Sequence, residues 1–275
     1  MIEDALGPID YEENGQGRTI VFVPGSCSTG AAWKPVITAL SGSYRTITTS
    51  LPGYGGSAER RTTTDQSISL LASAIEVVVR HAGGPVHLVG HSFGGEVGLA
   101  VALRGHVGLQ SLTILEAPAP AMLSNFNRPD FYNEFRAMTS AYIQDYCSGN
   151  AEAIASMVDF YGGAGTFASW PPAVRGYAVK TTPTNILDWQ SAYACEPSSA
   201  ALARLSIPVL VAVGAKSNPA VVEANSLIAK AIPNATLATI EGATHFMTAT
   251  HPSAVANLVA GHIAASYDHQ SHLPR

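Results

Sequence analysis

Ser92 is the side chain of this sequence best placed to act as a nucleophile. It is the central residue of Gly90-His91-Ser92-Phe93-Gly94, between an apolar stretch over residues 85–89 and a helical pattern over residues 94–103. A G-x-S-x-G sequence between a strand and a helix is typical of a sharp turn that exposes the serine hydroxyl. Larger residues two positions before or after the serine would collide with the neighbouring chain, which explains both glycines. A chance glycine–serine turn is the alternative interpretation.

A nucleophilic serine needs a base, and His245 is the candidate among nine histidines. Imidazole titrates close to neutral pH, so it can take the serine proton and return it. His245 lies in a short segment between a predicted strand over residues 236–240 and a predicted helix over residues 252–265. His91 is adjacent to Ser92, but in such a turn we expect its side chain to point elsewhere.

These motifs resemble those of the α/β-hydrolase family and occur in the order typical of it. The resemblance covers nearly the whole chain except a variable central segment, and it implies that the loop containing His245 carries the general base. It also implies an oxyanion hole formed by backbone N–H groups, which here would be those of Ser26 and Phe93. Family members often have a histidine in the first of these two loops, where this chain has Pro24.

The acidic residue departs from the common family pattern. Most members have an aspartate after the strand that follows the central segment, but residues 215–219 contain no carboxylate, and the next acid, Glu223, falls within a predicted helix. Glu116 ends the strand after the elbow helix, where a buried carboxylate is costly unless it is paired. Some branches, including certain haloalkane dehalogenases and zearalenone-type lactonases, place their acid there. We therefore expect Glu116 to orient His245, with Glu223 as the second candidate. The alternative interpretation is that Glu116 is a solvated glutamate at the end of its strand without a catalytic role.

Ser92, His245 and Glu116 together predict acyl transfer through an acyl-enzyme. The predicted protein is a serine hydrolase that cleaves a carboxylic ester or lactone of a hydrophobic or aromatic small molecule. No cofactor is predicted, and metal-ligand spacings are absent from the sequence. A carbon–carbon bond hydrolase of the meta-cleavage type would use the same triad, and a non-catalytic ligand receptor can retain it. A haloalkane dehalogenase is disfavoured because its nucleophile is an aspartate.

Alternating strands and helices must position these side chains. Strands are predicted over residues 19–23, 44–50, 85–89, 112–115, 208–213 and 236–240, and helices over residues 31–40, 64–81, 94–103, 220–232 and 252–265. This alternation predicts an α/β fold with a mostly parallel, twisted sheet covered by helices on both faces. The candidate serine, acid and histidine then lie near the carboxyl ends of strands, where open sheets bind ligands.

Residues 118–203 interrupt this alternation and are predicted to form a helical cap (lid) inserted into a core domain of residues 1–117 and 204–275. The segment has helical patterns and most of the aromatic residues of the chain. Many of these rings must pack the cap, and others are expected to line an apolar pocket. The candidates for the substrate pocket are Cys27, Trp170, Trp189 and Phe246.

The composition indicates a chain that buries a large core, because 47% of its 275 residues are hydrophobic and 13% are charged. A net charge of −5 gives no sign of a nucleic-acid partner. The three cysteines show no pairing pattern, and no signal peptide or membrane-spanning stretch is recognisable. We therefore expect a cytoplasmic protein that binds a small-molecule substrate but neither nucleic acid nor membrane. The oligomeric state is open, with a homodimer as one option.

Overall fold

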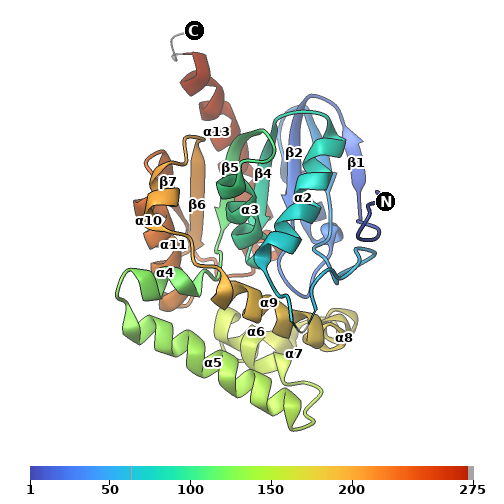
Figure 1. Ribbon diagram of the computed structural model, residues 1–275, viewed down its shortest axis with the longest axis vertical. Helices are drawn as coiled ribbons and strands as arrows, with labels where there is room; N and C mark the ends of the chain where they lie inside the picture. Colours follow the sequence, from blue (N-terminus) through green and yellow to red (C-terminus); the bar gives the residue numbers. More distant parts are fainter. Residues whose placement is uncertain (63, 272–275) are drawn as a thin grey trace.

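The computed structural model describes residues 1–62 and 64–271, with side chains up to residue 266, and its centre is a seven-stranded sheet (Figure 1). The strand order is β1-β3-β2-β4-β5-β6-β7. The strands are β1 (Glu12–Gly15), β2 (Arg18–Val23), β3 (Tyr44–Thr48), β4 (Val86–His91), β5 (Leu109–Leu115), β6 (Val209–Gly214) and β7 (Ala235–Ile240). All are parallel except β1, which pairs antiparallel with β3.

Helices cover both faces of the sheet. Because side chains alternate along a strand, Ile20 and Phe22 of β2 face one side, where α1 (Lys34–Ala39) and α13 (Pro252–Ser271) pack. The opposite side is covered by three helices: α2 (Ile68–Ala82), α3 (Phe93–Arg104) and α11 (Pro219–Ala231). Every residue of β4 and β6 is buried, as expected for central parallel strands. The predicted α/β class with a mostly parallel sheet is therefore confirmed.

The six predicted strands are all present, whereas β1 was not predicted. Its sequence, Glu-Glu-Asn-Gly, is polar and fully exposed, so it carries no apolar alternation. The predicted helix over residues 64–81 begins later, at Ile68, because the Ser67 hydroxyl accepts the Ser69 amide and caps the helix there. The predicted helix over residues 31–40 is divided into a 3₁₀ turn, η1 (Gly30–Trp33), and α1.

Helices alone connect β5 to β6 in the described chain. They are α4 (Pro120–Asn125), α5 (Pro129–Cys147), α6 (Ile154–Gly162), α7 (Thr166–Ser169), α8 (Pro172–Lys180), α9 (Thr182–Ala194) and α10 (Ser199–Ala203). In Figure 1, α5 to α9 form a layer across the carboxyl ends of the strands, and we call this layer the cap. The helix α4 packs against α5 and α9 of this layer as well as against α11, and α10 packs against α11. The division into a core domain and a cap insertion of residues 118–203 stays a prediction.

Two further observations concern the described residues only. None of their helices is both long and apolar enough to cross a membrane. The cysteines Cys27, Cys147 and Cys195 are free thiols, and no cluster of three or more histidine, cysteine or acidic side chains could hold a metal ion. The chain ends beyond the described residues, so the predicted core boundary at residue 275 lies outside them.

Candidate active site

Ser92 occupies the tight turn between β4 and α3. Its backbone has φ 53° and ψ −130°, a conformation rare for residues other than glycine. The Ser92 amide donates to the carbonyl of Leu115 on β5 at 2.8 Å, which fixes the turn to the neighbouring strand. A Cβ atom on Gly90 would lie 2.3 Å from the Gly94 carbonyl oxygen, and one on Gly94 would lie 2.3 Å from the Pro24 carbonyl oxygen. Both glycines are therefore required for the steric reason predicted from the sequence.

The loop after β2 packs directly against this turn. A Cβ atom on Gly25 would lie 2.8 Å from the Cβ atom of Ser92, so only glycine allows such a close approach. Ser26 follows Gly25 in this loop, and Phe93 is the first residue of α3. The amide of Phe93 belongs to the first turn of α3, whose N–H groups have no partner within the helix. Both residues line the same cavity as Ser92, as expected of a pair of oxyanion donors.

His245 and Glu116 form a buried pair. The Nδ1 atom of His245 lies 2.8 Å from Oε2 of Glu116, and the Glu116 side chain is 0% exposed. Since an ionised carboxylate only accepts, Nδ1 carries the proton, and Nε2 is free to act as a base. The Glu116 backbone amide donates to the Ala212 carbonyl of β6 at 3.1 Å, which holds the end of β5 in place.

Two further donors hold the other oxygen of Glu116. Oε1 accepts the Gly214 amide at 2.6 Å and the Ser217 hydroxyl. Burial raises the pKa of Glu116, but the hydrogen bond and charge of His245, with these two donors, lower it overall below the ordinary value. Ser217 lies in the loop where family members commonly have their aspartate. In this chain the loop has no carboxylate, but its Ser217 hydroxyl donates a hydrogen bond to Glu116.

Glu223, the second candidate acid, is used elsewhere. Its Oε1 lies 2.7 Å from Nε of Arg128, in a partly exposed ion pair. Among the described residues, Glu223 has no contact with His245, whereas Glu116 is hydrogen-bonded to it. The structure therefore brings Glu116, and not Glu223, to the candidate base.

His91 supports the loop of His245 through a hydrogen bond to its backbone. Its Nε2 donates to the His245 carbonyl at 2.8 Å, and the two rings lie 4.8 Å apart. Burial, followed by the charge of His245, lowers the pKa of His91 to about 3, so its ring is neutral at physiological pH. The contact between the His91 side chain and the His245 carbonyl was not predicted.

Ser92 and His245 share a cavity of about 310 Å³ between the core and the cap. All four predicted pocket residues, Cys27, Trp170, Trp189 and Phe246, line it. In the described residues no hydrogen bond joins the Ser92 hydroxyl to His245. Such catalytic hydrogen bonds are often long before substrate binds.

The cavity also has cap residues that were not among the predicted pocket residues, and three of them carry polar side chains. Tyr161 of α6 covers the ring of His245, with a centroid distance of 4.2 Å. Asn185 and Asp188 of α9 are each 2% exposed and lie on the cavity wall, one turn apart. The Asn185 Oδ1 atom has no hydrogen-bond partner in the described part of the chain. The spacing of Asn185, Asp188 and Trp189 on one helix face was the only signal available.

Comparison with known proteins identifies the family of the chain. Residues 20–258 match the model of the alpha/beta hydrolase family. A pimeloyl-[acyl-carrier protein] methyl ester esterase of Vibrio cholerae is 34% identical over 110 residues, which cover 40% of each chain. A putative carbamate hydrolase of Azorhizobium caulinodans is 32% identical over 40% of this chain and 42% of its own. The chain thus matches less than half the length of these relatives.

Solved structures show the same fold over almost the whole chain. An esterase from Exiguobacterium antarcticum superimposes with a TM-score of 0.76 and 20% identity, covering 96% of this chain and 98% of the other. A thermophilic esterase from Thermogutta terrifontis gives a TM-score of 0.73 and 21% identity, covering 94% and 93%. At this level of identity the likeness shows the fold alone.

Proposed function

The chain belongs to the alpha/beta hydrolase family, and we propose that it is a serine hydrolase that cleaves a carboxylic ester or lactone of a hydrophobic small molecule. The observation that carries the proposal is the buried hydrogen bond between Glu116 and His245, beside Ser92 in an apolar cavity. Relatives described as esterases, among them the Vibrio cholerae enzyme, support ester cleavage.

The proposed reaction is a two-step acyl transfer. The Ser92 hydroxyl attacks the substrate carbonyl carbon while Nε2 of His245 takes its proton. Glu116 holds Nδ1–H of His245 and stabilises the imidazolium, a role that its lowered pKa supports because the carboxylate stays ionised at neutral pH. The amides of Ser26 and Phe93 stabilise the oxyanion, at about 3 to 4 kcal/mol for each donor. His245 then protonates the leaving alcohol, and water attacks the acyl-enzyme with His245 as the base.

The cavity lining supports an apolar substrate. Trp170, Trp189 and Phe246 contribute aromatic surface, and Met157 and Val158 of α6 contribute aliphatic surface. Apolar walls favour hydrophobic acyl or alcohol groups, whereas a few polar groups set orientation.

One polar group of the cavity wall refines the substrate class. The Asn185 Oδ1 atom has no hydrogen-bond partner in the described part of the chain, and a buried acceptor is costly to leave unpaired. We therefore expect a substrate with a single hydroxyl or amide group on an otherwise apolar frame.

Covalent labelling and an ester panel test this proposal together. Wild-type protein should react with a fluorophosphonate probe and hydrolyse p-nitrophenyl esters and lactones of graded size, whereas Ser92→Ala should do neither. If the folded wild-type protein is neither labelled nor active, the hydrolase assignment is wrong and a ligand receptor is favoured. Hydrolysis of a vinylogous diketone without hydrolysis of any ester would favour a carbon–carbon bond hydrolase instead.

A further inference from the structure

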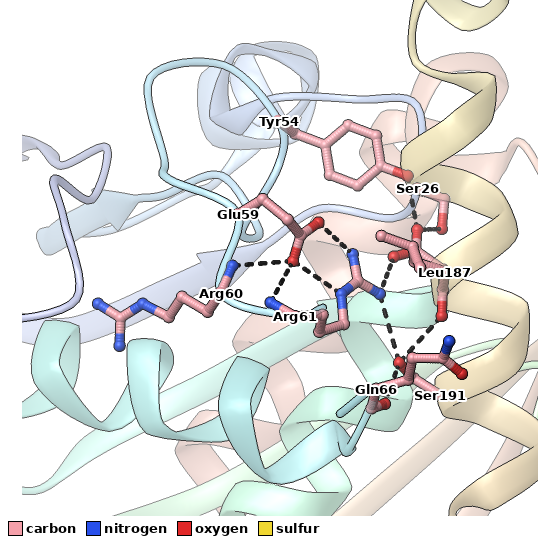
Figure 2. Close-up of polar contacts among 9 residues, drawn as sticks. Ser26, Tyr54, Glu59, Arg60, Arg61, Gln66, Leu187 and Ser191 are labelled. Carbon is pink, nitrogen blue, oxygen red and sulfur yellow. Dashed lines mark hydrogen bonds and ion pairs between the residues drawn. The ribbon is translucent and has the colours of Figure 1, made fainter. Parts of the chain in front are cut away.

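A buried polar network joins the cap to the loop that follows β2. Its centre is Asp188 of α9, which accepts hydrogen bonds from the side chains of Ser26, Tyr54 and Arg61. Figure 2 shows these three side chains close to the helix that carries Leu187 and Ser191. Oδ2 of Asp188 accepts the hydroxyls of Ser26 and Tyr54, each at 2.5 Å, and Oδ1 accepts Nη1 of Arg61 at 2.7 Å. Ser26 belongs to the loop after β2, and Tyr54 and Arg61 belong to the connection between β3 and α2, so this one cap carboxylate fixes α9 to two core loops.

Charge balance explains why Asp188 can be buried. The Arg61 guanidinium is 0% exposed and is shared between Asp188 and Glu59, whose Oε2 lies 2.7 Å from Nη2 of Arg61. Burial raises the pKa of Asp188 above its ordinary value, and the Arg61 charge and the two hydroxyl donors offset only part of this effect. Without these partners an ionised carboxylate at this depth would be strongly unfavourable. The network therefore requires the cap to lie against the core.

The loop that Asp188 contacts is the one beside Ser92. Gly25 packs against the nucleophile, and Ser26 carries the amide proposed as an oxyanion donor. The next residue, Cys27, has φ 55°, a left-handed conformation that a cysteine keeps only when its surroundings hold it. The hydrogen bond from the Ser26 hydroxyl to Asp188 ties the loop after β2 to α9 of the cap, and we call it the tether.

We propose that Asp188 is a positioning residue, which holds Ser26 so that the oxyanion hole is formed only when α9 of the cap is closed over the core. The inference rests on the proposed function. Substrate entry and catalytic activity are then coupled. When α9 moves away to admit substrate, Asp188 releases the Ser26 hydroxyl, and the loop after β2 becomes less firmly held. Closing α9 restores the donor beside Ser92.

Ser26→Ala tests the tether, because it removes the hydroxyl but keeps the backbone amide. The matched control is Tyr54→Phe, which removes a hydrogen bond of the same length to the same oxygen of Asp188 but leaves the Ser26 hydroxyl in place. We expect Ser26→Ala to lower kcat on a p-nitrophenyl ester about 10-fold to 100-fold, less than deletion of an oxyanion donor, with KM within about threefold of wild type. Tyr54→Phe should keep kcat within about threefold.

A second readout separates positioning from a general loss of structure. A trifluoromethyl ketone adds to the serine and forms an oxyanion, so its Ki should rise in Ser26→Ala by the same factor by which kcat/KM falls. Asp188→Asn should change both quantities in the same direction if it folds. The inference is overturned if Ser26→Ala keeps wild-type kcat and Ki, or if Tyr54→Phe loses as much as Ser26→Ala. Failure of the proposed function looks different, because the wild-type protein itself would then be inactive towards esters and ketone.

Discussion

At the scale of residues, two members of the proposed triad stand on strained backbone. Ser92 has φ 53° and Glu116 has φ 50°, and both follow the carboxyl end of a buried strand. Such conformations cost about 1 to 3 kcal/mol each and persist where the surrounding structure fixes them, often at functional sites. Here the fixing contacts are backbone hydrogen bonds from Ser92 to Leu115 and from Glu116 to Ala212. The backbone strain at these two residues is therefore consistent with a catalytic site.

Glu116→Gln should reduce kcat by about 10³-fold to 10⁴-fold while the fold stays intact. A glutamine amide can donate to Nδ1 of His245, which would favour the wrong imidazole tautomer. Ester hydrolysis together with circular dichroism would measure both effects. Glu223→Gln, the matched control, should keep near wild-type turnover, because Glu223 pairs with Arg128. The opposite order of the two variants would refute the role given to Glu116.

Acid sensitivity should depend on His91. The folded protein holds the pKa of His91 at about 3, whereas an ordinary histidine has a pKa near 6.5. The unfolded chain therefore binds the proton more readily, so His91 stabilises the fold above pH 6.5, and this contribution is lost as the pH falls towards 3. Urea unfolding between pH 7 and 5 should show a smaller loss of unfolding free energy in His91→Gln than in wild type. His106→Gln, which changes an exposed histidine, is the control and should lose as much unfolding free energy as wild type. If His91→Gln also loses as much as wild type, His91 is not the source of the acid sensitivity.

Residue roles were predictable where sequence neighbours determine them. Ser92 was identified by its flanking glycines, and Glu116 by the lack of a carboxylate after β6. Asp188 and Tyr161 were not predicted, because their roles come from contacts between the cap and the core that are far apart in sequence. Local patterns can place Asp188 on one face of a helix, but they do not show which core residues that face contacts.

At the scale of elements, hydrophobic periodicity predicted the strands that carry the site but not the edge strand β1. The central strands β4, β5 and β6 are apolar because helices cover both of their faces. The edge strand β1 is polar and held by main-chain pairing to β3, so no residue pattern marks it. The short helix α12 (Met247–Thr250), directly after His245, was also missed because four residues are too few for a period to show.

Gly25→Ala should impair the site more than the fold. The added methyl would lie 2.8 Å from the Ser92 Cβ atom and push the loop after β2 away from the nucleophile. We expect a loss of kcat of about 100-fold or more, since a donor is displaced from the oxyanion. Kinetics and thermal unfolding of the same preparation would measure it.

Gly176→Ala is the matched control for that substitution. Gly176 lies within α8, and a Cβ atom there would meet nothing within 4 Å. This variant should gain about 0.5 to 1 kcal/mol of stability and keep wild-type kcat. Equal activity of the two alanine variants would mean that the close approach of the loop to Ser92 has no catalytic consequence.

At the scale of the whole molecule, the sheet supplies the reacting groups, and the cap closes the cavity over them. The alternation of strands and helices was sufficient to predict this architecture, but not how the cap sits on the core. The cap orientation depends on contacts such as the buried pair of Arg61 and Asp188, which link segments more than 100 residues apart. A homodimer stays a prediction that light scattering can check.

Trp170→Ala should shift the preferred substrate towards longer acyl chains. The Trp170 ring lines the cavity and packs against Phe246 with a centroid distance of 5.1 Å, so its removal enlarges a space of about 310 Å³. The ratio of kcat/KM for long over short p-nitrophenyl esters should rise about 10-fold or more, the range expected for fitting extra methylene groups. An unchanged ratio would place the acyl group in another part of the cavity.

Identification of the residue that becomes acylated tests the central claim most directly. Wild-type protein is mixed with a p-nitrophenyl ester, quenched in acid within its first turnovers and digested for mass spectrometry. We predict an acyl group on Ser92, no adduct in Ser92→Ala, and much slower adduct formation in Glu116→Gln. Acylation of a different side chain, or turnover that persists in Ser92→Ala, would contradict it.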